Sequence, residues 1–84
     1  MSAAQLRILC LEDNTLDAEL IALRLQNDGV EHVIDRVDTR ESFETAIATG
    51  SYDLILADYA LPSFDGLTAL RMVRARYPDL PFIF

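Results

Sequence analysis

Short apolar runs alternate along the chain with longer stretches that carry apolar residues at helical spacing. Residues 6–11 and 52–57 are largely apolar, as expected of strands buried on both faces of a parallel sheet. Residues 31–37 are more polar, which predicts a strand nearer an edge of the sheet. The last run, residues 82–84, begins a fourth strand.

Polar residues and glycines predict where the first of three intervening helices begins and ends. Asn14 or Thr15 is expected to cap a helix over residues 16–27. Gly29 suits the left-handed residue that follows the last turn of such a helix. The apolar stripe that we expect to face the core consists of Leu16, Leu20 and Leu23, widened by Ile21 and Leu25.

Capping and helix-ending residues also mark the second and third helices. Asp38, with Glu41 three residues on, predicts a capping box that opens the second helix, which ends at Gly50. The third helix is predicted over residues 66–77, and its core-facing positions are Leu67, Leu70, Val73 and Tyr77. Strands that alternate with helices in this way predict an α/β fold, with parallel strands, right-handed crossovers and helices on both faces.

Length and charge narrow the classes of protein to consider. Eighty-four residues allow one small domain, and no apolar stretch approaches the roughly 20 residues of a membrane span. The net charge of −7 argues against binding to nucleic acid or to an anionic membrane surface. The first five residues lack the pattern of a signal peptide, so we expect a soluble, cytoplasmic protein. The single cysteine, Cys10, is expected to pack as a small hydrophobe.

Acidic residues follow two of the apolar runs. Glu12 and Asp13 come directly after the first run, and Asp58 comes directly after the third. Ligands of an open parallel sheet bind beyond the carboxyl ends of its strands, so neighbouring strands would bring these three carboxylates together. Like charges repel unless a proton or cation lies between them, and Mg²⁺ prefers such oxygen ligands. An aspartate in such a site can act as a nucleophile and form an acyl phosphate.

A simpler interpretation of these acids is that they cap the following helix or are solvated. For a single acid this would be the better explanation, because acids often follow a strand. The acidic pair Glu12 and Asp13 and the lone Asp58 stand at the same end of two apolar strands, and this recurrence favours a shared cation site.

Two longer stretches of the sequence carry a family resemblance. They are LRILCLEDNTLDAELI, with the acidic pair after the first strand, and YDLILADYALPSFDGLTALRMVR, where Asp58 is followed by Pro62 and then by Asp65 and Gly66. Together they resemble the receiver domain of response regulators in two-component signalling. The resemblance implies a flavodoxin-like, doubly wound parallel sheet, incomplete in this chain, with strand order 2-1-3-4.

The resemblance also implies a role for each matching residue. Asp58 matches the aspartate that accepts a phosphoryl group from a histidine kinase or phosphotransfer protein. Glu12, Asp13 and Asp58 match the carboxylates that hold Mg²⁺, and Ala60 matches the residue whose backbone carbonyl completes the metal site. The implied protein is a signalling phosphoacceptor that assists transfer to its own aspartate, and not an enzyme with a separate substrate.

Two features of the family are missing from these residues. Family members have a hydroxyl residue after the fourth strand and a lysine after a fifth strand, whereas this sequence contains no lysine and runs only to Phe84. We therefore expect residues 1–84 to be the N-terminal portion of a receiver domain.

Two alternative functions remain open at this point. A receiver-like fold without the lysine can serve as a non-catalytic interaction module, and an exposed edge on the fourth strand would favour a homodimer. A metal-dependent phosphatase with an aspartate nucleophile is a weaker alternative. Such enzymes usually need a second acid two residues after the nucleophile, and Ala60 stands at that place here.

Overall fold

A four-stranded parallel sheet in the order β2-β1-β3-β4 organises the chain. The computed structural model describes residues 5–58, 61 and 64–84. The strands are β1 (Leu6–Leu11), β2 (His32–Val37), β3 (Leu54–Ala57) and β4 (Phe82–Ile83). The predicted α/β fold and the predicted strand order are confirmed, and β1 lies between β2 and β3 with parallel pairing on each side.

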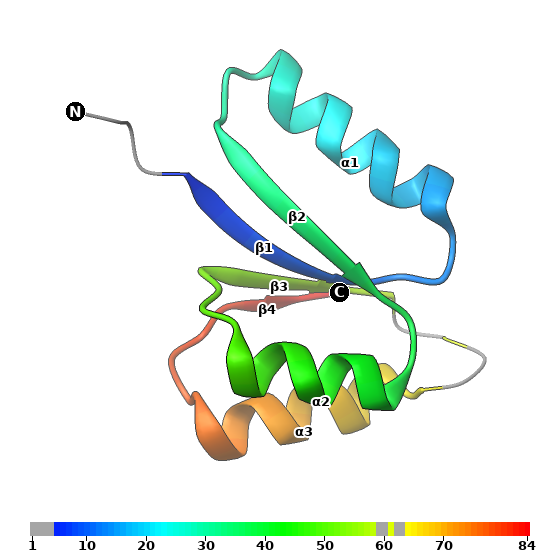
Figure 1. The fold of residues 1–84 in the computed structure, drawn as a ribbon, viewed down its shortest axis with the longest axis vertical. Helices are drawn as coiled ribbons and strands as arrows, with labels where there is room; N and C mark the ends of the chain where they lie inside the picture. Colours follow the sequence, from blue (N-terminus) through cyan, green and yellow to red (C-terminus); the bar gives the residue numbers. More distant parts are fainter. Residues whose placement is uncertain (1–4, 59–60, 62–63) are drawn as a thin grey trace.

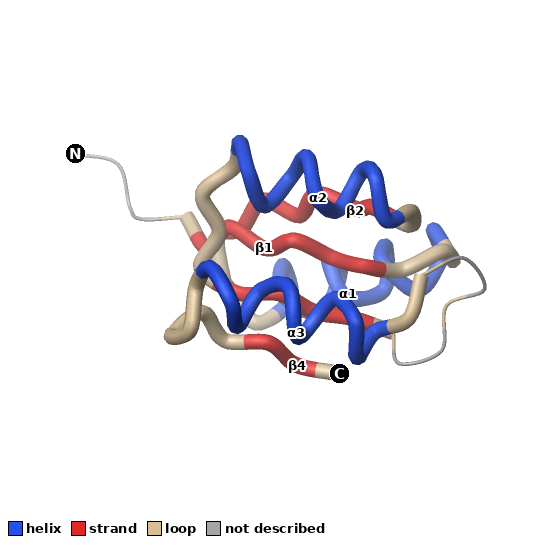
Figure 2. Tube along the Cα trace, turned by 90° about the horizontal axis from the view of Figure 1, so that it is seen from below, coloured by secondary structure: helices blue, strands red, loops and turns tan. Residues whose placement is uncertain are grey.

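Three helices cover the two faces of this sheet. They are α1 (Thr15–Asn27), α2 (Arg40–Thr49) and α3 (Gly66–Arg76). Figure 1 shows α1 on one side of the sheet, and α2 and α3 side by side on the other. The same layers are visible from below in Figure 2, so the sheet is doubly wound. No helix in the described ranges is long and apolar enough to cross a membrane.

The main core fills the space between the sheet and the pair α2 and α3. Its fully buried side chains include Leu9, Leu11 and Ile55 from the sheet and Phe43 from α2. The ring of Phe43 packs against that of Phe64, with 5.4 Å between the ring centroids. Odd-numbered residues of β1 therefore face α2 and α3, and even-numbered residues face α1.

The predicted N-terminal cap is confirmed for α1 and is wrong for α2. Asn14 caps α1 as predicted, because its side chain accepts hydrogen bonds from the first backbone N–H groups of the helix. The prediction that Asp38 caps α2 is wrong, since Thr39 is the cap and forms a capping box with Ser42. Asp38 lies one residue too early, and its carboxylate accepts a bond from Arg36 instead.

The predicted core face of α1 is also wrong in part. Leu16, Leu20 and Leu23 are 56%, 59% and 53% exposed, whereas Ala18 is the buried residue of the helix. The helix face next to the one predicted is turned to the sheet, and it carries Ala18 and Ala22. These side chains are small enough to let the helix backbone approach the strands. The three leucines form a stripe on the outer surface of α1, which we call the leucine stripe.

The end of α3 differs less from the prediction. Tyr77 is the C-terminal cap and not a core residue, and 36% of it is exposed. Its hydroxyl donates a hydrogen bond to the backbone carbonyl of Ile47, at 2.9 Å. Its ring therefore lies at the boundary of the core and ties the ends of α2 and α3 together.

Candidate functional site

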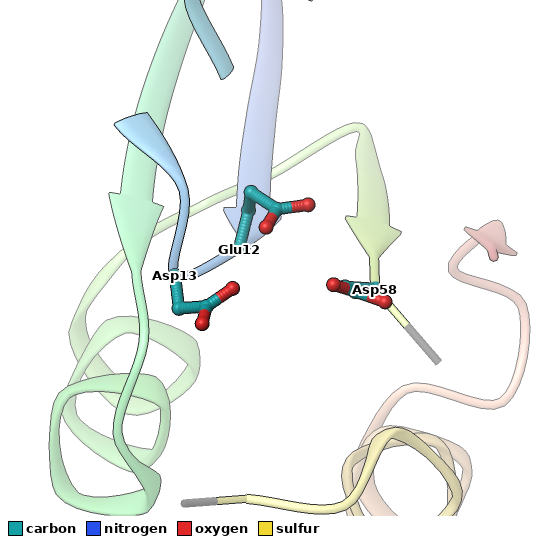
Figure 3. A group of neighbouring side chains, drawn as sticks. All are labelled: Glu12, Asp13 and Asp58. Atoms are coloured by element: carbon teal, nitrogen blue, oxygen red, sulfur yellow. The ribbon is translucent and has the colours of Figure 1, made fainter. Parts of the chain in front are cut away.

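Three carboxylates meet where β1 and β3 end. The two strands are paired through Leu11 and Ala57, so the residues that follow each strand emerge side by side. The backbone N–H of Asp58 extends this ladder by donating to the carbonyl of Leu11, at 2.9 Å. One oxygen from each of Glu12, Asp13 and Asp58 lies within 4.8 Å of the other two. Figure 3 shows the three carboxylates turned toward a common space.

Glu12 is held in place through three of its polar groups. Its backbone N–H donates to the carbonyl of Val37, at 3.0 Å. Its backbone carbonyl accepts from a guanidinium nitrogen of Arg36, at 3.0 Å. Its side-chain Oε1 accepts from the backbone N–H of Asn14, also at 3.0 Å. The edge strand β2 and the start of α1 therefore fix the position of this carboxylate together.

The pKa of Glu12 is raised first by its partial burial and then by its acidic neighbours. Partial burial raises the pKa of the Glu12 carboxyl, and its contact with Asp13 and the nearby charges of Asp58 and Asp17 raise it further. The hydrogen bond from the Asn14 N–H acts in the opposite direction. Ionised Glu12 is thus less stable here than in water, and a proton or a cation in the cluster would relieve this cost.

The residues present fit a hard divalent cation. All three side chains offer carboxylate oxygens, which Mg²⁺ and Ca²⁺ prefer over nitrogen or sulfur ligands. Asp13 is exposed and Glu12 and Asp58 are half-buried, so the space between them stays open to solvent and to a ligand. Ala60 and Pro62, which the sequence also suggested for this loop, lie outside the described residues.

A groove leads away from the acids along the α1 face of the sheet. It has a volume of about 490 Å³, and its walls include Asp17 and Ile21 of α1 and Leu56 of β3. Glu12 and Asp58 also line it, as does Ile83 of β4. The acid cluster therefore opens onto a space that is large enough for a phosphoryl group and part of its donor.

Sequence reasoning missed Arg36 as a residue of this site. Arg36 is paired in the sheet with Cys10, two residues before Glu12, and side chains of paired parallel residues lie on the same face. The signal in the sequence was the position of Arg36 in β2, which places its side chain on the same face of the sheet as Cys10 and Glu12. That signal was weak because the pairing of β2 with β1 had to be known first.

A family model and similar proteins of known sequence point to the same family. The family model described as the response regulator receiver domain matches residues 8–84. The transcriptional regulatory protein BasR of Escherichia coli is 33% identical over 78 residues, which cover 93% of this chain and 34% of BasR. Histidine kinase 5 of Arabidopsis thaliana is 35% identical over 69 residues, or 82% of this chain and 7% of that protein. The chain thus spans a small part of these relatives.

A solved structure has a similar fold and holds a metal ion. It is the receiver domain of the sensor histidine kinase PA1611 from Pseudomonas aeruginosa, with a magnesium ion coordinated in its active site cleft. The TM-score is 0.77 at 30% sequence identity. The match covers 94% of this chain and 65% of the PA1611 receiver chain.

The partial burial of Glu12 and its acidic neighbours predict the effect of neutralising this residue. We expect Glu12→Gln to raise the melting temperature of the metal-free protein at neutral pH by about 2–4 °C, which corresponds to roughly 0.5 kcal/mol after solvent screening. Because the pKa of Glu12 is raised in the folded state, ionisation costs stability as the pH rises above the ordinary value of 4.5. The gain should therefore vanish at pH values below 4.5, where Glu12 is protonated whether folded or not.

Thermal unfolding followed by circular dichroism, from below pH 4.5 to neutral pH, checks the prediction. Glu31→Gln is the matched control, because Glu31 is exposed and lies at the opposite end of the sheet, beside the start of β1. Equal melting temperatures for Glu12→Gln and the unmodified chain at neutral pH would show that the acid cluster carries no electrostatic cost.

Proposed function

The chain belongs to the response regulator receiver domains of two-component systems, and we propose that Asp58 is its phosphoacceptor. The donor is a histidine kinase or a phosphotransfer protein. The observation that carries this proposal is the convergence of Glu12, Asp13 and Asp58 at the ends of two paired strands. In the same proposal residues 1–84 form the N-terminal portion of a receiver domain, which is consistent with their covering 65% of the PA1611 receiver chain.

The reaction transfers a phosphoryl group between two protein side chains. A carboxylate oxygen of Asp58 attacks the phosphorus of a phosphohistidine, the P–N bond breaks as the new P–O bond forms, and the histidine leaves with the bonding electron pair and takes up a proton. The product is an acyl phosphate on Asp58. Bonding of the Asp58 N–H to the Leu11 carbonyl fixes the backbone from which this carboxylate projects.

Glu12, Asp13 and Asp58 are the residues that would hold Mg²⁺ in this site. The structure of the PA1611 receiver domain, with magnesium in its cleft, supports this assignment. A bound Mg²⁺ supplies positive charge that offsets the charge of the phosphoryl oxygens. The backbone carbonyl of Ala60 is proposed as a further ligand on the family resemblance, and Ala60 lies outside the described residues.

The protein acts as a carrier of the phosphoryl group and not as an enzyme with turnover on a separate substrate. The accepting carboxylate is its own Asp58, so each transfer modifies the protein itself. With a net charge of −7, this segment is not suited to nucleic acid or to an anionic membrane surface. We place it in the cytoplasm, where histidine kinases of two-component systems deliver their phosphoryl groups.

The leucine stripe suits the docking of the phosphoryl donor. Leu16 begins the stripe three residues after Asp13, and all three leucines are more than half exposed. An apolar strip of this kind on a helix favours contact with another apolar helix face. A donor that packs against α1 would bring its phosphohistidine to the acid cluster.

Phosphorylation of Asp58 is testable with a small-molecule donor. We expect acetyl phosphate with Mg²⁺ to add one phosphoryl group to the chain, as measured by intact mass, and hydroxylamine to remove it because the linkage is an acyl phosphate. Asp58→Asn should abolish the addition, since an amide is a poor nucleophile. Asp79→Asn, an exposed residue before β4, should label like the unmodified chain. Labelling that persists in Asp58→Asn would refute the assignment.

A second candidate function is a non-catalytic module that pairs with another copy of itself. The observation that favours it is the β4 edge of the sheet, where Ile83 is 52% and Phe84 is 50% exposed. Apolar edge strands invite pairing with another chain.

Self-association through this edge predicts concentration-dependent sedimentation. We expect Ile83→Lys to reduce the association, because a charged side chain on an edge strand opposes pairing. Val33→Lys is the matched control on the opposite edge strand, β2, where Val33 is 38% exposed. A monomer at every concentration would exclude the pairing module and leave the phosphoacceptor function untouched.

A further inference from the structure

The backbone around Glu12 is held by β2 through the two peptide groups that flank this residue. Each peptide group is planar and moves as one unit, so a hydrogen bond to one of its polar atoms restricts the orientation of the whole group. The group before Glu12 is fixed by its N–H, which donates to the Val37 carbonyl at 3.0 Å. The group after Glu12 contains the Glu12 carbonyl and the N–H of Asp13, and Arg36 donates to that carbonyl at 3.0 Å.

Arg36 is placed for this contact by its strand and by a neighbouring acid. The pairing of Cys10 with Arg36 sets the guanidinium beside the end of β1 and on the face that carries Glu12. The same guanidinium nitrogen lies 3.4 Å from a carboxylate oxygen of Asp38. Only 33% of the Arg36 side chain is exposed, so its long stem is partly packed and its freedom is reduced.

We propose that Arg36 is a positioning residue for the acidic pair, because it fixes the peptide group that joins Glu12 to Asp13. This peptide group sets where the Cα of Asp13 lies, and so where its carboxylate can reach. Groups that orient the ligands of a metal commonly determine its affinity. This inference rests on the proposed function of the acid cluster as a cation site, and it adds a residue of β2 to that site.

Charge and positioning predict opposite effects for the loss of Arg36. A positive side chain near the acids repels a divalent cation, so its removal should tighten binding if charge alone matters. Loss of the bond to the Glu12 carbonyl should weaken binding, because the peptide group gains freedom that the cation must then suppress. The sign of the change in Mg²⁺ affinity therefore separates the two roles.

The experiment measures Mg²⁺ affinity by calorimetry in the whole chain and three variants. We expect Arg36→Gln to raise the dissociation constant roughly three- to tenfold, near the low end for residues that orient metal ligands because Arg36 is partly exposed. Arg36→Lys keeps the positive charge and N–H donors, and it should recover most of the affinity. Arg24→Gln is the matched control, since Arg24 pairs with Asp28 at the other end of α1.

Backbone ¹⁵N relaxation gives a second readout that does not need the metal. We expect Arg36→Gln to lower the order parameters of the Asp13 and Asn14 amides and to leave those of β3 unchanged. Arg24→Gln should change none of them. These measurements also show whether each variant is folded, so a change in affinity is not mistaken for unfolding.

Two results would overturn the positioning role. One is an Arg36→Gln variant that binds Mg²⁺ as tightly as the unmodified chain or more tightly. The other is an unchanged order parameter at Asp13 in that variant. If the unmodified chain binds no Mg²⁺, the proposed metal site fails, and the relaxation data alone then decide whether Arg36 fixes the Glu12–Asp13 peptide group.

Discussion

The parallel pairing of β1 with β3 is the constraint on which the site depends. It places Leu11 beside Ala57, and the next residue of each strand is then an acid. A shift of either strand by one residue would turn its side chains from the face covered by α2 and α3 to the face covered by α1. The packing of Leu9 and Ile55 against α2 and α3 therefore also fixes Glu12 and Asp58. The acids come together as a consequence of core packing and not of any attraction between them.

The acid cluster is therefore maintained against its own electrostatics. The pKa of Glu12 is raised by partial burial and by its acidic neighbours, which means that the ionised cluster costs stability. Hydrogen bonds with β2 and with the start of α1 hold Glu12 in place despite this cost. A divalent cation among the three carboxylates would replace their mutual repulsion with attraction to the cation. A cluster that costs stability when empty can therefore bind a metal ion.

The sequence predicted the order of elements and the strand ends well, because both depend on local pattern. Apolar runs and turn residues mark the strands, and the acids follow two of them directly. It failed where the answer depends on three-dimensional neighbours. The leucine stripe is as apolar as a core face, and only the packing of Ala18 against the sheet shows that the stripe points outward. The contact from Arg36 to Glu12 joins residues 24 positions apart, so no local pattern reveals it.

The proposed function depends on joint binding of one divalent cation by Glu12, Asp13 and Asp58. The most direct test adds small amounts of Mn²⁺, a paramagnetic substitute for Mg²⁺, and follows the side-chain carboxyl ¹³C signals by NMR. The signals of these three residues should broaden first and together, and excess Mg²⁺ should restore them. Broadening spread evenly over the exposed acids, or confined to acids away from the ends of β1 and β3, would contradict the claim.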